Sequence, residues 1–383
     1  MVRLNRNSIQ TTGKVDSVNI AFPERVFKET NPEDSGKRNI YSWKNIDNSV
    51  PAVILKLDHY QSLGIIRSLG KLKIPVYGIG ISGISHSSLS RYCKKSFTID
   101  MDNLGDEKLN NFLLNLADRL NKRPVLIPTT DETALFVARN SEQLRNHFIF
   151  SDSPADVISS FSNKKDCYFL ARHYGIPTQK SIFPLTTNEV INFSREAVYP
   201  LVLKGIDGGK LEKKAGKKMV IVENRSELLS YYKLLEDRDY PNLIIQEYIP
   251  QDHNQMWIFN GYFDLHSNCK AAFTGIKIRQ NPIYTGMTSF GVCRWNDKLI
   301  DLSSKLMKEV GYHGPVDIDF IYDKNDNTYK ILDVNPRIGA TFRMFVGKNG
   351  IDIARAMYLD LTGQQINFSR PEEERKWFVE DKD

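Results

Sequence analysis

The chain has 383 residues, more than the roughly 100–200 of a typical domain, so we expect two or three packed units. Hydrophobic residues make up 41% and charged residues 26%, which is ordinary for a globular protein with a sizeable core. The net charge of +6, from 52 basic and 46 acidic side chains, is spread along the chain. It suits a small anionic ligand and lacks the one-sided basicity of a nucleic-acid-binding protein.

The sequence favours a cytoplasmic protein without a membrane or nucleic-acid partner. No stretch approaches the roughly 20 consecutive apolar residues of a membrane span, and the N-terminus lacks the apolar core of a signal peptide. The four cysteines form neither a CxxC nor a Cys/His metal spacing, so we interpret them as reduced thiols. They are Cys93, Cys167, Cys269 and Cys293.

In chain order, residues 1–48 are polar and show no apolar period, which predicts an irregular extension. From Pro51 apolar runs alternate with helical periods, which predicts an open α/β domain over residues 49–150. Its expected strands are 52–57, 75–78 and 125–128. Its expected helices are 62–69, 106–121 and one that begins at Asp131.

From residue 151 onward, the pattern predicts helices mixed with antiparallel strands. The expected helices are 163–174, 227–235, 299–310 and 353–361. The expected strands are 201–204, 219–222, 243–246, 316–322 and 328–335, with further antiparallel strands over 255–294. The strands 316–322 and 328–335 form a hairpin.

This hairpin carries a row of polar side chains. Alternate residues of a strand share a face, so Asp317 and Asp319 point the same way on one strand, and Asp333 and Asn335 on the other. A register that sets Asp317 opposite Asp333 brings all four together. Crowded carboxylates repel one another, and Mg²⁺ held by one or two of them with phosphate oxygens relieves that repulsion. The alternative is a sheet with a solvated acidic face.

Lysines follow another buried strand. Lys204 ends the run Pro200-Leu-Val-Leu-Lys204 and precedes a glycine-bearing loop, from which it can reach a phosphate. A solvated lysine at a strand end is the alternative. The lysines of 210–218 form either a basic lid over a triphosphate or a soluble loop. The segment 243–250, an apolar strand that runs into Pro250, offers backbone groups and an apolar wall to a purine, or is a core strand.

A glycine motif invites a different interpretation. Gly78-Ile-Gly-Ile-Ser-Gly83 satisfies GxGxxG and follows an expected strand. The residues after it lack a helical period, and no acid for a ribose stands at the right strand end. We therefore reject a dinucleotide-binding site.

Taken in order, these motifs resemble those of the ATP-grasp ligases, particularly the carboxylate–amine ligase branch with its D-aspartate ligase-like proteins, over about residues 51–362. The resemblance implies an ATP-grasp fold, in which two α+β subdomains sandwich ATP, over 151–362, with a lid subdomain at 180–250. An open α/β domain precedes it and a tail over 363–383 follows. The implied cofactors are ATP and Mg²⁺, with Mn²⁺ as a substitute. The implied partners are a small-molecule carboxylate and an amine, and a homodimer is compatible with the family.

The resemblance also implies which residues bind the nucleotide. Two lysines contact phosphate, the first in a helix before Gly175-Ile-Pro177 and the second at the end of a strand. A hinge lines the adenine, and either of two residues after it contacts the ribose. A basic residue on the next strands meets the triphosphate. The helix lysine is Lys164 and the strand lysine is Lys204. The hinge residues are Gln246, Glu247 and Ile249, and the ribose contact is Asp252 or Asn254. The candidates for the triphosphate contact are Lys277 and Arg279.

The implied metal ligands are Asp319, Asp333 and Asn335, and Arg337 matches the arginine that contacts phosphate or acyl phosphate. The chain departs from the family pattern where Asp333 replaces a common Glu and where a lysine-rich segment replaces a glycine-rich loop. Two alternatives to an amide- or peptide-forming ligase stay open. One is a non-catalytic ATP-binding regulatory module. The other is a carboxylase or carbamoyl-phosphate-type enzyme, which is disfavoured because the sequence shows no biotin domain or glutaminase segment.

Overall fold

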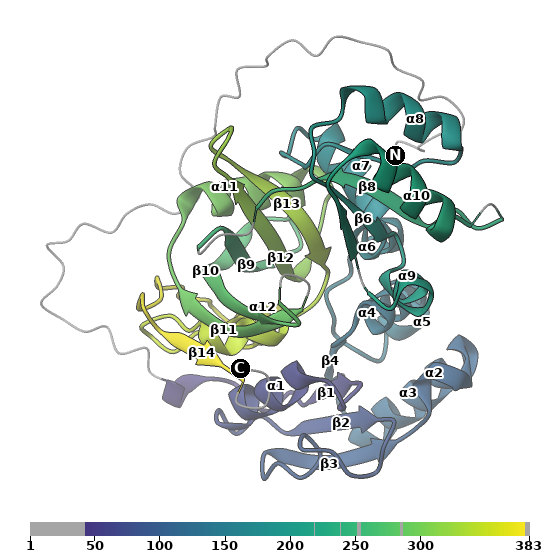
Figure 1. Cartoon of the computed structure of the whole chain (residues 1–383). Helices are drawn as coiled ribbons and strands as arrows, with labels where there is room; N and C mark the ends of the chain where they lie inside the picture. The colour runs from purple at the N-terminus through teal and green to yellow at the C-terminus, as the bar shows by residue number, and fades with distance from the viewer. Residues whose placement is uncertain (1–42, 218, 238, 251–253, 284–285, 380–383) are drawn as a thin grey trace, which may run out of the picture.

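The computed structural model describes residues 43–379, apart from 218, 238, 251–253 and 284–285. The described residues form three sheets, which Figure 1 shows as a lower N-terminal sheet, a large central sheet and a smaller sheet at the upper right. No helix among these residues is both long and apolar enough to cross a bilayer.

The N-terminal sheet has four parallel strands in the order β3-β2-β1-β4, of which β3 is not among the three expected strands. They are β1 (Ala52–Leu55), β2 (Val76–Gly80), β3 (Cys93–Thr98) and β4 (Val125–Ile127). The helices are α1 (Tyr60–Gly70), α2 (Met101–Leu104), α3 (Asp106–Leu120), α4 (Asp131–Arg139) and α5 (Ser141–Leu144). All four residues of β1 are buried, because helices cover both faces of the sheet.

The GxGxxG glycines occupy the end of β2 and the turn after it. β2 ends at Gly80, and the described residues 81–92 contain bends and turns but no helix. The helix N-terminus that a dinucleotide pyrophosphate requires is therefore missing at this point.

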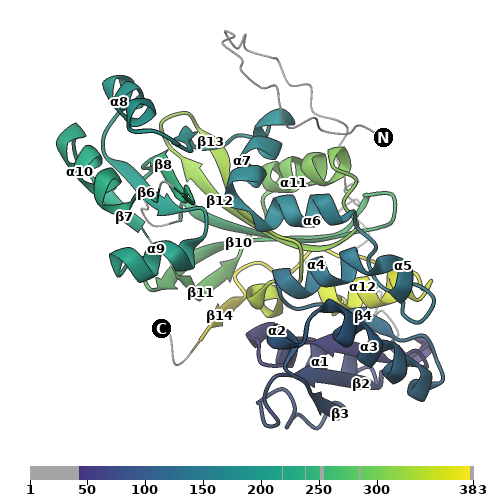
Figure 2. The same ribbon diagram turned by 90° about the vertical axis from the view of Figure 1, so that its right-hand side faces the viewer.

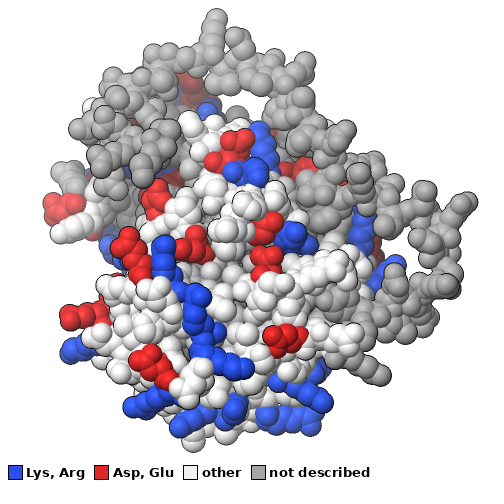
Figure 3. Space-filling view, turned by 180° about the vertical axis from the view of Figure 1, so that it is seen from behind, with Lys and Arg blue, Asp and Glu red and all other residues white. Residues whose placement is uncertain are grey.

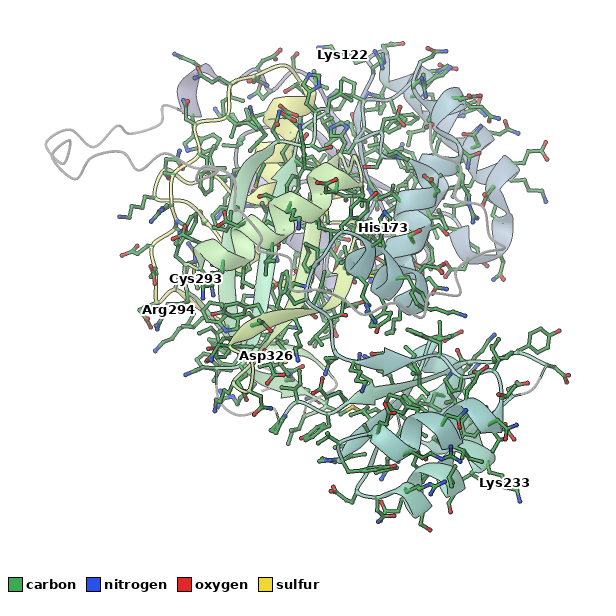
Figure 4. The ribbon with its side chains drawn as sticks, turned by 90° about the horizontal axis from the view of Figure 1, so that it is seen from above. Lys122, His173, Lys233, Cys293, Arg294 and Asp326 are labelled. Atoms are coloured by element: carbon green, nitrogen blue, oxygen red, sulfur yellow. The ribbon has the colours of Figure 1, made fainter. Side chains whose placement is uncertain are left out.

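The second sheet, which we call the lid sheet, has the strand order β5-β8-β6-β7 with antiparallel neighbours. Its strands are β5 (Ser181–Ile182), β6 (Leu201–Gly205), β7 (Met219–Val222) and β8 (Leu243–Glu247). Its helices are α8 (Thr187–Glu196), α9 (Gly208–Ala215) and α10 (Arg225–Leu235). Figure 4, seen from above, shows Lys233 on α10 at the outer side of this sheet, away from the main body.

Residues 210–215 of the lysine-rich segment lie in helix α9 and not in the loop that the sequence predicts, and Lys218 lies outside the described residues. Asp207 caps α9 by accepting hydrogen bonds from the backbone of Gly209 and Lys210. Lys214 Nζ donates to the carbonyls at the end of α10, 3.3 Å from Leu235 O and 2.7 Å from Glu236 O. Lysine at a helix C-terminus satisfies carbonyls that otherwise lack partners, so this side chain joins two helices of the lid.

The large sheet has the order β13-β12-β9-β10-β11-β14. Its strands are β9 (Met256–Phe263), β10 (Cys269–Asn281), β11 (Met287–Cys293), β12 (Gly314–Asp323), β13 (Thr328–Asn335) and β14 (Lys376–Phe378). On one face lie α6 (Ala155–Ser162), α7 (Lys164–His173) and α11 (Asp297–Glu309) (Figure 2). On the other lie the 3-10 helix η3 (Ala340–Met344) and α12 (Ile353–Leu361).

The last helix completes the core of the N-terminal sheet. Met357 and Tyr358 of α12 are buried in one cluster with Ile54 and Ile65. The 3-10 helix η2 (Trp43–Asn45) joins the same region, with Trp43 Nε1 3.2 Å from the carbonyl of Asn349. Residues 1–42 of the expected extension lie outside the described residues, and the part from residue 43 packs against this core.

The surface is of mixed charge. From behind, lysine and arginine side chains lie among acidic and uncharged ones, and they gather at the lower end of this face, over the N-terminal sheet (Figure 3).

Candidate functional site

The polar row on the β12–β13 hairpin forms with a different pairing from the expected one. Asp319 lies opposite Asp333, and Asp317 lies opposite Asn335. The expected pairing of Asp317 with Asp333 is therefore wrong by two residues. Because side chains alternate with a period of two, this shift leaves all four on one face. A bulge between Asp319 and Phe320 interrupts the ladder just beyond them.

The positive charges of two lysines from other elements act on Asp333. Lys164 is the first residue of α7, and Lys204 is near the end of β6 in the lid sheet. Burial raises the pKa of Asp333, and the positive charges of Lys164 and Lys204 partly offset that effect. Burial, together with the neighbouring charge of Lys164, lowers the pKa of Lys204 to about 8. The structure thus brings both predicted phosphate-binding lysines near the acidic hairpin.

A third lysine contacts the other acid of the facing pair. Lys277 Nζ of β10 lies 2.6 Å from Asp319 Oδ2, and its side chain is 9% exposed. Next to it, Asn260 Nδ2 donates to Asp317 Oδ1 at 2.6 Å. Burial and the charge of Asp319 raise the pKa of Asp317 to about 7. Gly339 covers Asp317 so closely that a Cβ at position 339 would collide with the carboxylate.

Arg337 connects the hairpin to the N-terminal sheet. Its Nη2 donates to Asn335 Oδ1 at 3.1 Å, and its Nε lies 3.0 Å from Asp131 Oδ1. Asp131 is the first residue of α4, directly after β4, so it stands at the carboxyl edge of the parallel sheet, where α/β proteins bind ligands. Burial raises the pKa of Asp131, and Arg337 partly offsets this. The sequence pattern marks Asp131 only as a helix start.

The predicted hinge lies where β8 leaves the lid sheet. Gln246 Nε2 donates to Ser181 Oγ of β5 at 2.8 Å. The Glu247 carboxylate lies 3.6 Å from Lys330 Nζ of β13, which also contacts Asp323 at 2.6 Å. Figure 4 places Asp326, another partner of Lys330 at 3.0 Å, on the turn of the hairpin. This buried lysine, which the sequence analysis does not single out, therefore links the lid sheet to the large sheet.

A small apolar cluster continues from the hinge. Ile249 is 3% exposed and packs with three residues of the large sheet, Met256, Ile321 and Leu332. Such an apolar wall suits the flat face of a purine. That Ile249 lines a base stays a prediction.

The remaining predicted residues are less informative. Asp252 lies outside the described residues. Asn254 has a φ of +68°, and its carbonyl accepts a hydrogen bond from Trp257 Nε1 at 3.1 Å. Arg279 is exposed on β10, and its guanidinium carbon lies 4.8 Å from the Phe290 ring centroid. Of the two predicted basic residues on β10, Lys277 contacts the acidic hairpin through Asp319.

The donor set fits a magnesium ion that also binds a nucleotide. Asp319 and Asp333 face each other, and Asn335 adds an amide oxygen. Among the described residues, no group of three or more His, Cys, Asp or Glu side chains gathers closely enough to hold a metal. Mg²⁺ commonly takes only one or two carboxylates and completes its octahedron with phosphate oxygens and water, so two facing carboxylates meet its needs.

Comparisons with known proteins agree with this geometry. Residues 162–341 match the family model of the ATP-grasp domain. The chain is 24% identical over 243 residues to D-aspartate ligase of Enterococcus faecium, which covers 61% of this chain and 58% of the relative. The chain thus spans less than two thirds of that relative's length.

Two solved structures share the architecture. The biotin carboxylase domain of 2-oxoglutarate carboxylase from Hydrogenobacter thermophilus, a dimer in complex with MgADP, ADP and bicarbonate, has a TM-score of 0.62 and 19% identity, covering 83% of this chain and 71% of that one. L-amino acid ligase from Bacillus licheniformis has a TM-score of 0.62 and 14% identity, with coverage of 84% and 78%. At these identities the likeness concerns the fold, and it confirms the predicted ATP-grasp fold with a preceding α/β domain.

Proposed function

We propose, from the premise that residues 162–341 form an ATP-grasp domain, that this protein is an ATP-dependent carboxylate–amine ligase that works with Mg²⁺ through an acyl phosphate. The observation that carries the proposal is the convergence on one hairpin of two facing carboxylates and lysines from three other elements. The relationship to D-aspartate ligase supports an amine as the acceptor.

In this mechanism the chain binds and orients charged reactants. Lys164, Lys204 and Arg279 hold the triphosphate, and Asp319 and Asp333, with Asn335, hold Mg²⁺. When bound, the metal neutralises charge on the phosphate oxygens. A substrate carboxylate oxygen attacks the γ-phosphorus, the bond to the β-phosphate oxygen breaks, and ADP leaves.

Arg337 steadies the acyl phosphate that results. An amine nitrogen then attacks the acyl carbon, phosphate leaves, and the nitrogen gives up a proton, so that an amide or peptide bond forms. The described residues act by position and electrostatics, and the mechanism requires no side-chain nucleophile. The contact of Arg337 with Asp131 supports a location for this second step beside the carboxyl edge of the N-terminal sheet.

The decisive experiment is a screen for ADP formation with Mg²⁺ and ATP. We expect release of ADP only when a carboxylate and an amine, such as a pair of amino acids, are both present. Chelation of Mg²⁺ is expected to remove the activity. ADP release that depends on bicarbonate in place of an organic carboxylate would identify a carboxylase-type enzyme instead. Nucleotide binding without any acceptor-dependent turnover would favour a regulatory module.

The lowered pKa of Lys204 predicts how the affinity for ADP depends on pH. Its pKa is lowered to about 8 by burial and by the charge of Lys164. Bound phosphate favours the charged lysine, so the protein takes up a proton on binding, and affinity for ADP falls as pH rises through 8. Between pH 7.5 and 9.5, where phosphate is already ionised, the dissociation constant is expected to rise by about tenfold or more.

Lys204→Arg is the matched control, because a guanidinium stays charged over this range. Calorimetric titration with ADP at each pH measures both proteins. The variant is expected to show a much flatter pH profile. Equal slopes for the two proteins would contradict the assignment of Lys204 to the phosphates.

A further inference from the structure

Gln179 is a buried amide with one atom left unpaired. The residue lies between the Gly175-Ile-Pro177 turn and β5 and is 6% exposed. Its Nε2 donates to the backbone carbonyl of Glu247 at 3.1 Å. Its Oε1 is buried and has no hydrogen-bond partner. Buried side-chain oxygens nearly always have a partner, so this oxygen is available to accept a hydrogen bond from a ligand.

The orientation of this amide is fixed by its surroundings. Reversing it would set the amide oxygen against the Glu247 carbonyl oxygen, which is unfavourable. The backbone on both sides is also held: Ser181 Oγ donates to Gln179 O at 3.0 Å, and Glu247 N donates to Lys180 O at 2.9 Å. Gln179 therefore presents an acceptor, and not a donor, from a rigid segment.

The residues around Gln179 indicate which chemical group of a ligand donates a hydrogen bond to its Oε1. Gln179 contacts Glu247, two residues before Ile249 and its apolar cluster. This cluster, which begins two residues after Glu247 in the sequence, is suited to the flat face of a purine. Adenine carries at position 6 an amino group with two N–H donors. Guanine and hypoxanthine carry a carbonyl oxygen there, which would face the oxygen of Gln179.

We infer that Gln179 selects the base of the nucleotide, with Oε1 accepting a hydrogen bond from the 6-amino group of adenine next to the hinge carbonyl. This inference rests on the proposed function, since it takes the apolar cluster as the base site. A site that hydrogen-bonds a substrate group discriminates strongly against analogues that lack it, because its own buried groups are then left unpaired. Gln179 acts in binding and specificity and takes no part in the chemical steps.

The test is a calorimetric comparison of three nucleotides on the full chain: ADP, purine riboside diphosphate, which lacks the 6-amino group, and IDP, which has a carbonyl there. Wild-type protein is expected to bind ADP at least about tenfold more tightly than the other two. In Gln179→Met the ratio of the dissociation constants for purine riboside diphosphate and ADP is expected to fall by about fivefold or more. Gln179→Leu replaces it if the methionine variant does not fold.

Gln255→Met is the matched control. Gln255 is also buried, at 3% exposed, and its Nε2 donates to the Tyr322 carbonyl at 3.1 Å. This variant loses a comparable amide-to-carbonyl hydrogen bond, and its preference for ADP is expected to stay at the wild-type level. An unchanged ratio in the Gln179 variants, or equal wild-type affinity for ADP and purine riboside diphosphate, overturns the inference. Failure of wild-type protein to bind ADP at all overturns the proposed function itself.

Discussion

Replacing Asp333 by Asn is expected to lower the rate of ADP formation by about 1,000-fold while the chain stays folded. Asp333 faces Asp319 across the hairpin and lies in the field of Lys164 and Lys204. Loss of its charge weakens Mg²⁺ binding, and with it the several kcal/mol of charge stabilisation that a metal supplies to phosphoryl transfer. Because burial raises the pKa of Asp333, its charged form is costly to bury, and a neutral isostere should cost little stability.

Turnover with saturating Mg²⁺ and thermal unfolding are the two measurements. The control is Asp326→Asn on the turn of the same hairpin, where the side chain is 46% exposed. That variant is expected to keep turnover within about tenfold of wild type, since it lies outside the donor set. Full activity in the Asp333 variant would contradict the assignment of Asp333 as a ligand of Mg²⁺.

Arg337→Met is expected to reduce turnover by about 100- to 1,000-fold and to lower stability by about 1–2 kcal/mol. The arginine both stabilises the acyl phosphate in the proposed mechanism and pairs with Asp131. Without it, the Asp131 carboxylate, whose pKa burial already raises, is left without its cation.

A second substitution separates these two roles. Adding Asp131→Asn to Arg337→Met removes the unpaired charge, so the melting temperature is expected to recover while turnover stays low. The measurements are thermal unfolding and acceptor-dependent ADP release. Recovery of turnover in the double variant would mean that Arg337 acts only through the fold, and would contradict its catalytic assignment.

The large elements of the fold follow from the sequence because their patterns are local. The parallel N-terminal sheet is predictable because buried apolar runs such as 52–55 are separated by segments with a helical apolar period. The helix Ile353–Leu361 and the strand Met219–Val222 have the predicted bounds. Helix α8, whose mean character is polar and which buries only Val190 and Ser194, escapes prediction.

The acidic hairpin shows what local patterns leave open. Strand alternation fixes which side chains share a face, but pairing depends on the turn and on the bulge after Asp319, which the alternation does not encode. The predicted residues therefore meet on one face with partners shifted by two positions. Residues 210–215 of the lysine-rich segment likewise lie in helix α9 because Asp207 caps it and α10 provides acceptors for Lys214.

Contacts between distant segments were the least predictable part of the site. Asp131 and Arg337 are separated by about two hundred residues, and each alone looks like an ordinary charged residue. The roles of Gln179 and Lys330 depend on their contacts with Glu247 in the hinge, and these contacts form only in the folded chain. Sequence periodicity describes one element at a time, whereas these pairs depend on how three sheets are assembled.

The position of α12 bears on the order in which the protein acquires its structure during synthesis. Tyr358 donates through its hydroxyl to the carbonyl of Val50, and Asp352 accepts from Ser68 on α1. Residues 52–127, which carry the N-terminal sheet, are thus synthesised well before α12 (Ile353–Leu361), which closes one side of that sheet. During that interval, the apolar side of β1 and α1 is exposed to chaperones and to neighbouring nascent chains.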